Sequence, residues 1–356
     1  MSRSLDVSVL ARLRTEDARA VYDDVTGALA DLPADLGQLL EIEVLGDSSH
    51  PPLEPGVHLL RDGAAVAVPK LRVVQAFFVA RRILHAHLVE GPAPPAGSDR
   101  QVLRATTALL LMDSEHLTAA SIRKRALLAD LQNATSDPGA EADADADADA
   151  AQLLRRELQF VDSLLTAHLH RHTKSPTLWG HRRWLLGQCA ARGVGVDPRG
   201  DLNRVVMVAG ERHPRNYYAW DHARWLFREP GPEATTTAAA AAIVAGDVKK
   251  WCFRHPSDTS GWSFLLFLVS KIPDPELRRT THAAVVAETL ELADAFRWVN
   301  ESVWVFLRTM VAEQQQVESF VAVNEKLSAV LGEEPGSLAI LRRARDWLDK
   351  NRVPVP

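Results

Sequence analysis

The chain has 356 residues, of which 46% are hydrophobic, 24% charged and 6% aromatic, and its formal net charge is -5. This composition excludes wholesale disorder, and the acidic balance gives no indication of nucleic-acid binding. Two cysteines, Cys189 and Cys252, are too few for a disulfide framework or a cysteine zinc site. The longest apolar stretch, 238–245, is too short to span a membrane, and the N-terminus lacks an apolar signal core. We therefore expect a cytoplasmic protein.

In chain order, apolar residues recur mostly at helical spacing, as in 73–83 and 153–165, while only 39–45 could form a short strand. Clusters of proline and glycine separate these segments. The pattern predicts an all-α fold. It also divides the chain into an N-terminal helical region with Pro-rich linkers (1–99), a repeat region (100–315) and C-terminal capping helices (316–356).

An acidic segment interrupts the repeat region. Residues 141–150 read EADADADADA and follow SDPGA. Like charges four residues apart weaken a helix. We therefore expect residues 137–150 to be a disordered acidic insertion rather than an acidic binding arm.

Four segments share a frame around one tryptophan, and the anchor residue recurs every 41 or 42 residues. A degenerate copy at 116–128 has Ala120 where the tryptophan would stand, and the acidic insertion explains the longer step that follows it. Five copies predict tandem helical hairpins, an α-solenoid. The anchors are Trp179, Trp220, Trp262 and Trp304.

Polar residues that favour helix N-caps stand four residues before each anchor, so the tryptophan should lie in the first turn of a helix. Arginine recurs four residues after three of the anchors, on the same helix face. We expect these signature residues to be structural. The caps are Ser175, Asn216, Asp258 and Asn300, and the arginines are Arg183, Arg224 and Arg308.

Residues 216–225 (NYYAWDHARW) and 174–184 (KSPTLWGHRRW) carry a resemblance to a known family. They are similar to the protein prenyltransferase alpha-subunit (PPTA) repeat, and the resemblance covers about residues 100 to 315. Within the family, LLLMD before copy one, KSP in copy two and SDxSGW in copy three resemble the branch of protein prenyltransferase alpha subunit repeat-containing proteins.

The resemblance implies a crescent of paired helices around a separate β subunit, which holds the catalytic zinc and most of the isoprenoid pocket. It implies transfer of an isoprenyl group from its diphosphate to a cysteine thiolate of a target protein. For this branch it implies the β subunit of Rab geranylgeranyltransferase, a geranylgeranyl lipid, and a protein substrate with a C-terminal cysteine. No cofactor is expected in this chain itself.

The resemblance assigns three residues to the reaction. Lys174 stands where the family has a lysine near the isoprenoid diphosphate, and an ammonium at a helix N-terminus favours a departing anion. Thr177 and Tyr218 stand at substrate-binding positions. Pro176 and Thr177 replace a tyrosine and a glutamine of farnesyltransferase-like chains, and Tyr218 replaces a histidine. These departures favour a substrate that is already folded, escorted or partly modified.

Other site patterns are weak. His168 and His172 have the spacing of a metal pair, but no further ligand stands at motif spacing, so we expect no metal. His172, His213 and His255 each precede an anchor by seven residues, which indicates a repeat position. The basic run 123–125 is short and indicates a solvated or interface helix face rather than nucleic-acid binding.

Two functions remain open. The chain is the α subunit of a heterodimeric protein geranylgeranyltransferase that is inactive alone, or it is a helical-repeat scaffold that kept the fold and lost the enzyme. Lys174 favours the first, whereas Ala120 in copy one and Leu266, in place of arginine, in copy three favour the second. A tetratricopeptide-like adaptor is disfavoured, because its period of about 34 residues does not fit.

Overall fold

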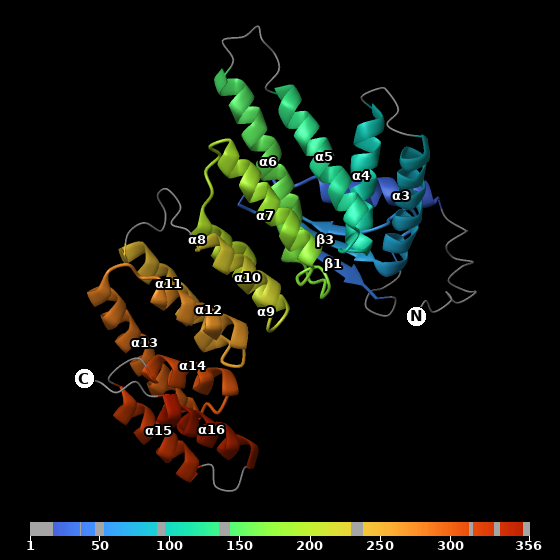
Figure 1. Ribbon diagram of the computed structural model, residues 1–356. Coiled ribbons are helices and arrows are strands. Elements are labelled where there is room, and N and C mark those ends of the chain that lie inside the picture. Colours follow the sequence, from blue (N-terminus) through green and yellow to red (C-terminus); the bar gives the residue numbers. More distant parts are fainter. Residues whose placement is uncertain are drawn as a thin grey trace. The chain divides into compact units, whose positions relative to one another are not determined.

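A computed structural model describes residues 17–35, 37–46, 53–90, 97–134, 143–228, 238–312, 316–330 and 335–351. The described chain is predominantly helical, as predicted (Figure 1). It divides into two compact units, residues 1–196 with 211–213, and residues 197–210 with 214–356. No helix in the described part of the chain combines the length and the apolar character that crossing a membrane requires.

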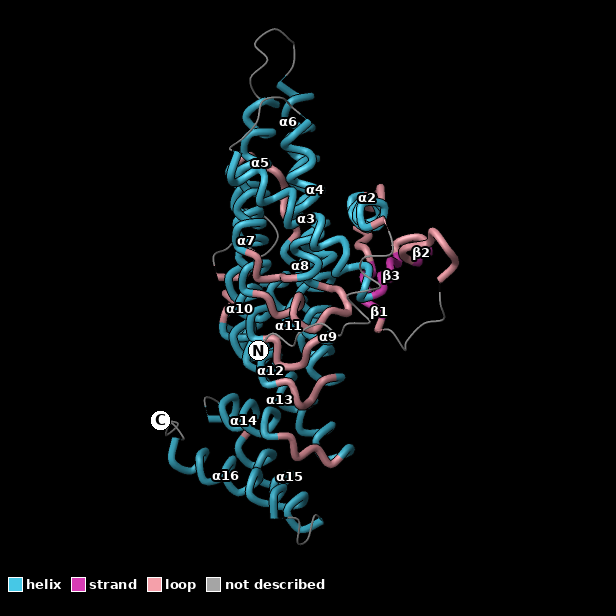
Figure 2. Tube along the Cα trace, turned by 90° about the vertical axis from the view of Figure 1, so that its right-hand side faces the viewer, coloured by secondary structure: helices cyan, strands magenta, loops and turns pink. Residues whose placement is uncertain are grey.

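The described part of the first unit begins with a helix and a small sheet. Strand β1 (Glu41–Leu45) pairs in parallel with β3 (Ala65–Pro69), which pairs antiparallel with β2 (Leu60–Asp62). Helices α2 (Ala18–Ala30) and α3 (Lys70–Glu90) pack against this sheet. Figure 2 shows the strands in magenta beside α2.

The predicted strand at 39–45 is confirmed as β1, but the sequence analysis missed β2 and β3. These two strands are short, so their alternation of apolar and polar residues is weak. The turn between them did carry a signal, because Gly63 is the first residue of the two-residue loop 63–64, where glycine is favoured, and it adopts φ 56°.

Helical hairpins form the rest of the first unit. Helix α4 packs against α5, and α6 packs against α7. Two hydrogen bonds connect the region of α6 with that of β1. Leu40 N, just before β1, donates to Ser163 Oγ of α6 (3.0 Å), and His168 N, just after α6, donates to the Ile42 carbonyl of β1 (3.1 Å). The bounds are α4 Gly97–Met112, α5 Leu117–Ala134, α6 Asp143–Leu165 and α7 Pro176–Ala191.

The prediction of a disordered insertion at 137–150 is wrong for its second half. Helix α6 begins at Asp143, and Ala150 is buried. Alanine is the strongest helix former, and acidic residues are favourable at a helix N-terminus, so these terms outweigh the repulsion between aspartates. Residues 137–142 lie outside the described residues.

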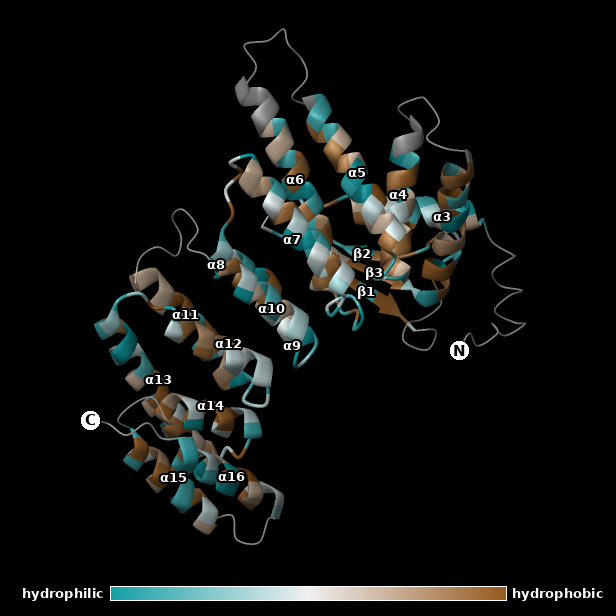
Figure 3. Ribbon diagram, viewed as in Figure 1, coloured by the Kyte–Doolittle hydropathy of each residue, from teal (hydrophilic) through white to brown (hydrophobic). Residues whose placement is uncertain are grey.

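The second unit is also built from pairs of helices. Helix α11 packs against α12, α13 against α14 and α15 against α16. Figure 3 shows brown, hydrophobic residues and teal, hydrophilic residues along these helices, as expected when one face is buried. The elements are α8 Pro198–Asp201, the π-helical turn η1 Leu202–Val206, α9 Met207–Arg212, which crosses the boundary between the units, α10 Tyr217–Leu226, α11 Ala238–Arg254, α12 Thr259–Ser270, α13 Pro275–Phe296, α14 Glu301–Ala312, α15 Val317–Val330 and α16 Pro335–Asn351.

Candidate functional site

The anchor positions of the repeat are equivalent in all five copies. Each anchor tryptophan is the fourth residue of its helix (α7, α10, α12 or α14), and all four are at most 4% exposed. Ala120 is likewise the fourth residue of α5 and is buried. In that copy the Nδ1 atom of His116 accepts the N–H of Ala119 (3.2 Å), so a histidine caps the helix. The degenerate copy therefore keeps the register of the others.

The predicted N-caps make their bonds in three copies. Ser175 Oγ accepts the N–H of Leu178 (3.1 Å), and Asn216 Oδ1 accepts the N–H of Ala219 (3.2 Å). Asp258 Oδ1 accepts two N–H groups. In the fourth copy the backbone carbonyl of Asn300 accepts the N–H of Trp304 (3.2 Å).

Three of the four indoles donate to the carbonyl six residues upstream. Trp179 donates to Thr173 (2.9 Å), Trp262 to Pro256 (3.1 Å) and Trp304 to Trp298 (2.8 Å). Each tryptophan thus fixes the loop that leads into its own helix. Before α7 this bond fixes Thr173, the residue that precedes Lys174.

The signature arginines lie partly buried along the same helices. The Nη2 atom of Arg224 donates to Ser263 Oγ (2.8 Å), and Arg308 stacks on Trp347 at 4.8 Å. Burial lowers the pKa of both guanidinium groups. Arg183 is half-buried on α7. The contacts of Arg224 and Arg308 agree with a structural role, because both side chains interact with protein groups.

Lys174 directly precedes the N-cap of α7. Its neighbours Thr173 and Ser175 are buried, and the Oγ of Ser175 donates to the Ser114 carbonyl (3.0 Å). Lys174 itself is exposed. The lysine therefore projects from a fixed position beside the positive end of a helix dipole, where an anion binds favourably.

The two predicted substrate-binding residues differ in their surroundings. Thr177, in the first turn of α7, donates its hydroxyl to Glu115 Oε2 (2.6 Å). Tyr218, in the second unit, is half-buried and contacts Tyr217 edge-on at 4.8 Å between ring centroids. The Thr177 hydroxyl proton is thus already used, which leaves its oxygen as an acceptor.

Sequence reasoning missed the buried ion pairs behind α7. Arg123 of α5 forms two short bonds to Glu157 of α6 (2.7 and 2.6 Å), and Arg182 of α7 bonds to Asp162 of α6 (2.7 Å). His181 lies 3.5 Å from Glu157, and burial lowers its pKa to about 4. The partners come from different helices, so no local pattern could show them.

The basic run 123–125 was expected to form a solvated or interface helix face, and its three residues divide between the two. Arg123 is buried in its ion pair, and its guanidinium also lies over the ring of Phe160 at 4.1 Å. The Nζ atom of Lys124 lies 5.4 Å from the ring centroid of Trp184, while Arg125 is exposed. Arg123 and Lys124 therefore pack among α5, α6 and α7.

The histidines that precede the anchors have different environments. The Nε2 atom of buried His172 bonds to the Leu110 carbonyl (2.8 Å), and His255 stacks on Trp251 at 4.2 Å. The ring of His213 instead contacts the ring of His170 at a tilt of 60°. Within the described ranges, no three or more His, Cys, Asp or Glu side chains gather in a way that could hold a metal ion. Both cysteines are buried, and burial raises the pKa of Cys252.

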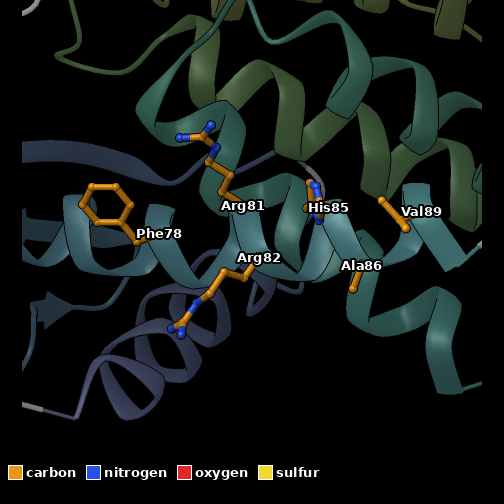
Figure 4. A pocket seen from close by; sticks show the side chains of 6 residues that line it. All are labelled: Phe78, Arg81, Arg82, His85, Ala86 and Val89. Atoms are coloured by element: carbon orange, nitrogen blue, oxygen red, sulfur yellow. The ribbon is translucent and has the colours of Figure 1, made fainter.

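A second basic feature lies on α3. Side chains of this helix line a shallow groove of about 500 Å³ (Figure 4). Phe78 and Val89 lie at its two ends and are 42% and 70% exposed. The charge of this groove suits an anion, and its ends suit an apolar group. It is lined by Phe78, Arg81, Arg82, His85, Ala86 and Val89.

Two family models match the chain. The ECM9 middle domain matches residues 182–290, from α7 to α13. No curated protein matches the chain. The protein prenyltransferase alpha subunit repeat matches residues 154–189, a single repeat that runs from α6 through most of α7 and includes Lys174 and Trp179. This single-repeat match and the helical fold support the resemblance of the chain to the protein prenyltransferase alpha subunit family.

Proposed function

We propose that this chain is the α subunit of a heterodimeric protein prenyltransferase that attaches a geranylgeranyl group to a cysteine of a target protein. One observation carries the proposal. The matched repeat contains Lys174, which is exposed directly before the N-cap of α7. A lysine at a helix N-terminus is suited to bind the diphosphate of an isoprenyl donor.

In the proposed reaction the thiolate sulfur of the target cysteine bonds to C1 of the isoprenyl diphosphate. The bond between C1 and the diphosphate oxygen breaks, and pyrophosphate leaves with the electron pair. Negative charge on the leaving group grows as this bond breaks. Lys174 therefore stabilises the transition state more than the ground state, which raises the rate of the chemical step.

The partner chains belong to the proposal as well. The β subunit would be like that of Rab geranylgeranyltransferase and would hold the catalytic zinc, because the described residues of this chain offer no suitable donor set. The protein substrate would carry a C-terminal cysteine. Thr177 and Tyr218 would contact that substrate, and the complex would work in the cytoplasm.

The test is single-turnover transfer of labelled geranylgeranyl diphosphate by the chain reconstituted with the β subunit of Rab geranylgeranyltransferase. Lys174→Ala should slow transfer by about ten- to a thousandfold, with a smaller effect on lipid binding. Lys174→Arg should recover part of the rate, because it restores the charge. Lys70→Ala is the matched control, since Lys70 is also an exposed lysine at the start of a helix.

A second function, a non-catalytic helical-repeat scaffold, is favoured by the loss of the anchor tryptophan at Ala120 and by the engaged hydroxyl of Thr177. If the chain pairs with the β subunit but transfers nothing to any cysteine substrate, the scaffold function is correct. An unchanged rate for Lys174→Ala would show that the family role of this lysine does not apply here.

A further inference from the structure

Three basic groups crowd together at the start of α7. His170 and Lys174 lie in the loop between α6 and α7, and His213 follows the end of α9. The rings of His170 and His213 are 4.1 Å apart, centroid to centroid, with a 60° tilt. All three residues belong to the first compact unit.

No described acidic side chain pairs with these three basic groups. Within the described part of the chain, none of the three side chains forms an ion pair, and the Nδ1 atom of His213 is buried without a hydrogen-bond partner. The equivalent histidine of copy two, His172, is instead bonded to a backbone carbonyl. Like charges at the positive end of a helix repel each other unless an anion lies among them.

The titratable groups that act on His213 from the facing loop are His170 and Lys174, and both are basic. Partial burial and the neighbouring His170 and Lys174 lower the pKa of His213. Along its own element, Glu211 and Arg212 precede it with opposite charges. These neighbours favour the neutral form of His213, and an anion would reverse this preference because it favours the protonated ring.

We propose that His170, His213 and Lys174 form a binding site for a doubly charged phosphate-type anion, and that the histidine pair takes up a proton when the anion binds. The inference rests on the proposed function, in which pyrophosphate is the leaving group. Lys174 supplies a permanent charge, and the histidines supply a charge that appears only with the ligand. Binding should therefore strengthen as the pH falls and weaken as it rises.

Sulfate is the probe of choice, because it keeps two negative charges throughout this pH range. Calorimetric titration of the full chain should show binding that weakens by up to about tenfold per pH unit between about pH 6 and about pH 8. Titration in buffers of different ionisation enthalpy should show uptake of up to one proton. Inorganic pyrophosphate should compete with sulfate for the same site.

The variants separate the two kinds of charge. His213→Gln and His170→Gln should each weaken binding at low pH and flatten its pH dependence, and His170→Gln serves as the second test if His213→Gln does not fold. Lys174→Ala should weaken binding at every pH. His168→Gln is the matched control and should behave like the wild type, because His168 is an exposed histidine outside the cluster.

Failure of this inference is distinguishable from failure of the proposed function. Sulfate binding that is absent, independent of pH or unaffected by both histidine variants would overturn the inference, whatever the transfer assay shows. Proton-coupled sulfate binding in a chain whose heterodimer transfers no lipid would support the anion site and overturn the proposed function alone.

Discussion

Helices α7 and α12 begin with the same repeat frame but with opposite local charge. The cap of α7 is the neutral Ser175, with Lys174 before it. The cap of α12 is Asp258, whose Oδ1 accepts the N–H groups of Ser260 and Gly261 and whose Oδ2 accepts the N–H of Arg215 (2.6 Å). The start of α12 thus carries a carboxylate in its own cap, whereas the start of α7 carries the ammonium of Lys174 before a neutral cap.

The packing behind the two helices differs as well. Helix α7 rests on the buried ion pairs of Arg123 with Glu157 and of Arg182 with Asp162. Helix α12 rests on aromatic rings, since Trp262 lies 4.8 Å from Phe306 between ring centroids. The same repeat frame can therefore be stabilised by buried ion pairs, as at α7, or by the packing of aromatic rings, as at α12. The region of α7 should respond to changes in charge and pH, and the region of α12 to changes in volume.

The largest expected effect comes from breaking the ion pair behind α7. Glu157→Ala leaves Arg123 buried without its partner and should reduce the free energy of unfolding by about 3–5 kcal/mol. Urea unfolding measures the loss, and hydrogen exchange of α7 places it. Glu288→Ala breaks the pair of Lys249 with a 45% exposed carboxylate and should cost less than about 1 kcal/mol. Equal losses would contradict the comparison.

A pH-dependent effect of about 3 kcal/mol is expected from His181. Its pKa is about 4 in the folded state and 6.5 in the unfolded chain, so only the unfolded chain binds the proton between these values. The wild type should lose stability as the pH falls from 6.5 to about 4. His181→Gln has no imidazole to protonate. Its free energy of unfolding should therefore rise relative to that of the wild type as the pH falls. A constant gap would refute the prediction.

The caps should differ by a smaller amount. Asp258→Ala removes three acceptor contacts, including the one that holds Arg215 at its left-handed φ of 60°, and should cost about 2 kcal/mol. Ser175→Ala should cost about 1 kcal/mol. Asp258→Asn keeps an oxygen for the helix N–H groups and should fall between wild type and Asp258→Ala. Thermal unfolding of the full-length variants measures all three.

Local chemistry explains what the sequence predicted. Caps and anchor tryptophans interact with residues a few positions away, so their spacing alone placed α7, α10, α12 and α14. The acidic segment was misjudged because repulsion between aspartates was weighed without the helix propensity of the alanines between them. The hairpin of β2 and β3 was missed although Gly63 marked its turn.

Long-range contacts limited the prediction of the site. The family resemblance identified Lys174, but it assigned no role to His170, and His213 was interpreted only as a repeat position. Their contact depends on how the loop before α7 meets the end of α9. The pairing of Arg123 with Glu157 likewise depends on how α5 packs against α6. Such contacts join segments far apart in the chain, and no spacing within either segment shows them.

Two glycine substitutions should have effects of opposite sign in the two helices. A Cβ atom at Gly261 of α12 would lie 2.5 Å from Cζ3 of Trp251, a side chain that is 1% exposed and has no room to move. Gly261→Ala should therefore cost about 1–3 kcal/mol through overpacking. A Cβ atom at Gly180 of α7 meets nothing within 4 Å, so Gly180→Ala should stabilise the chain by up to about 1 kcal/mol through helix propensity.

Gly187→Ala, also on α7, is the control for helix propensity, because a Cβ atom there has the same open surroundings. Thermal unfolding of the three variants checks the signs. Destabilisation by Gly180→Ala together with tolerance of Gly261→Ala would reverse the comparison. It would mean that α7 is the tightly packed helix and that the aromatic rings around α12 can yield. The opposite outcome would show that shape limits substitution at the start of α12, whereas charge sets the properties of the start of α7.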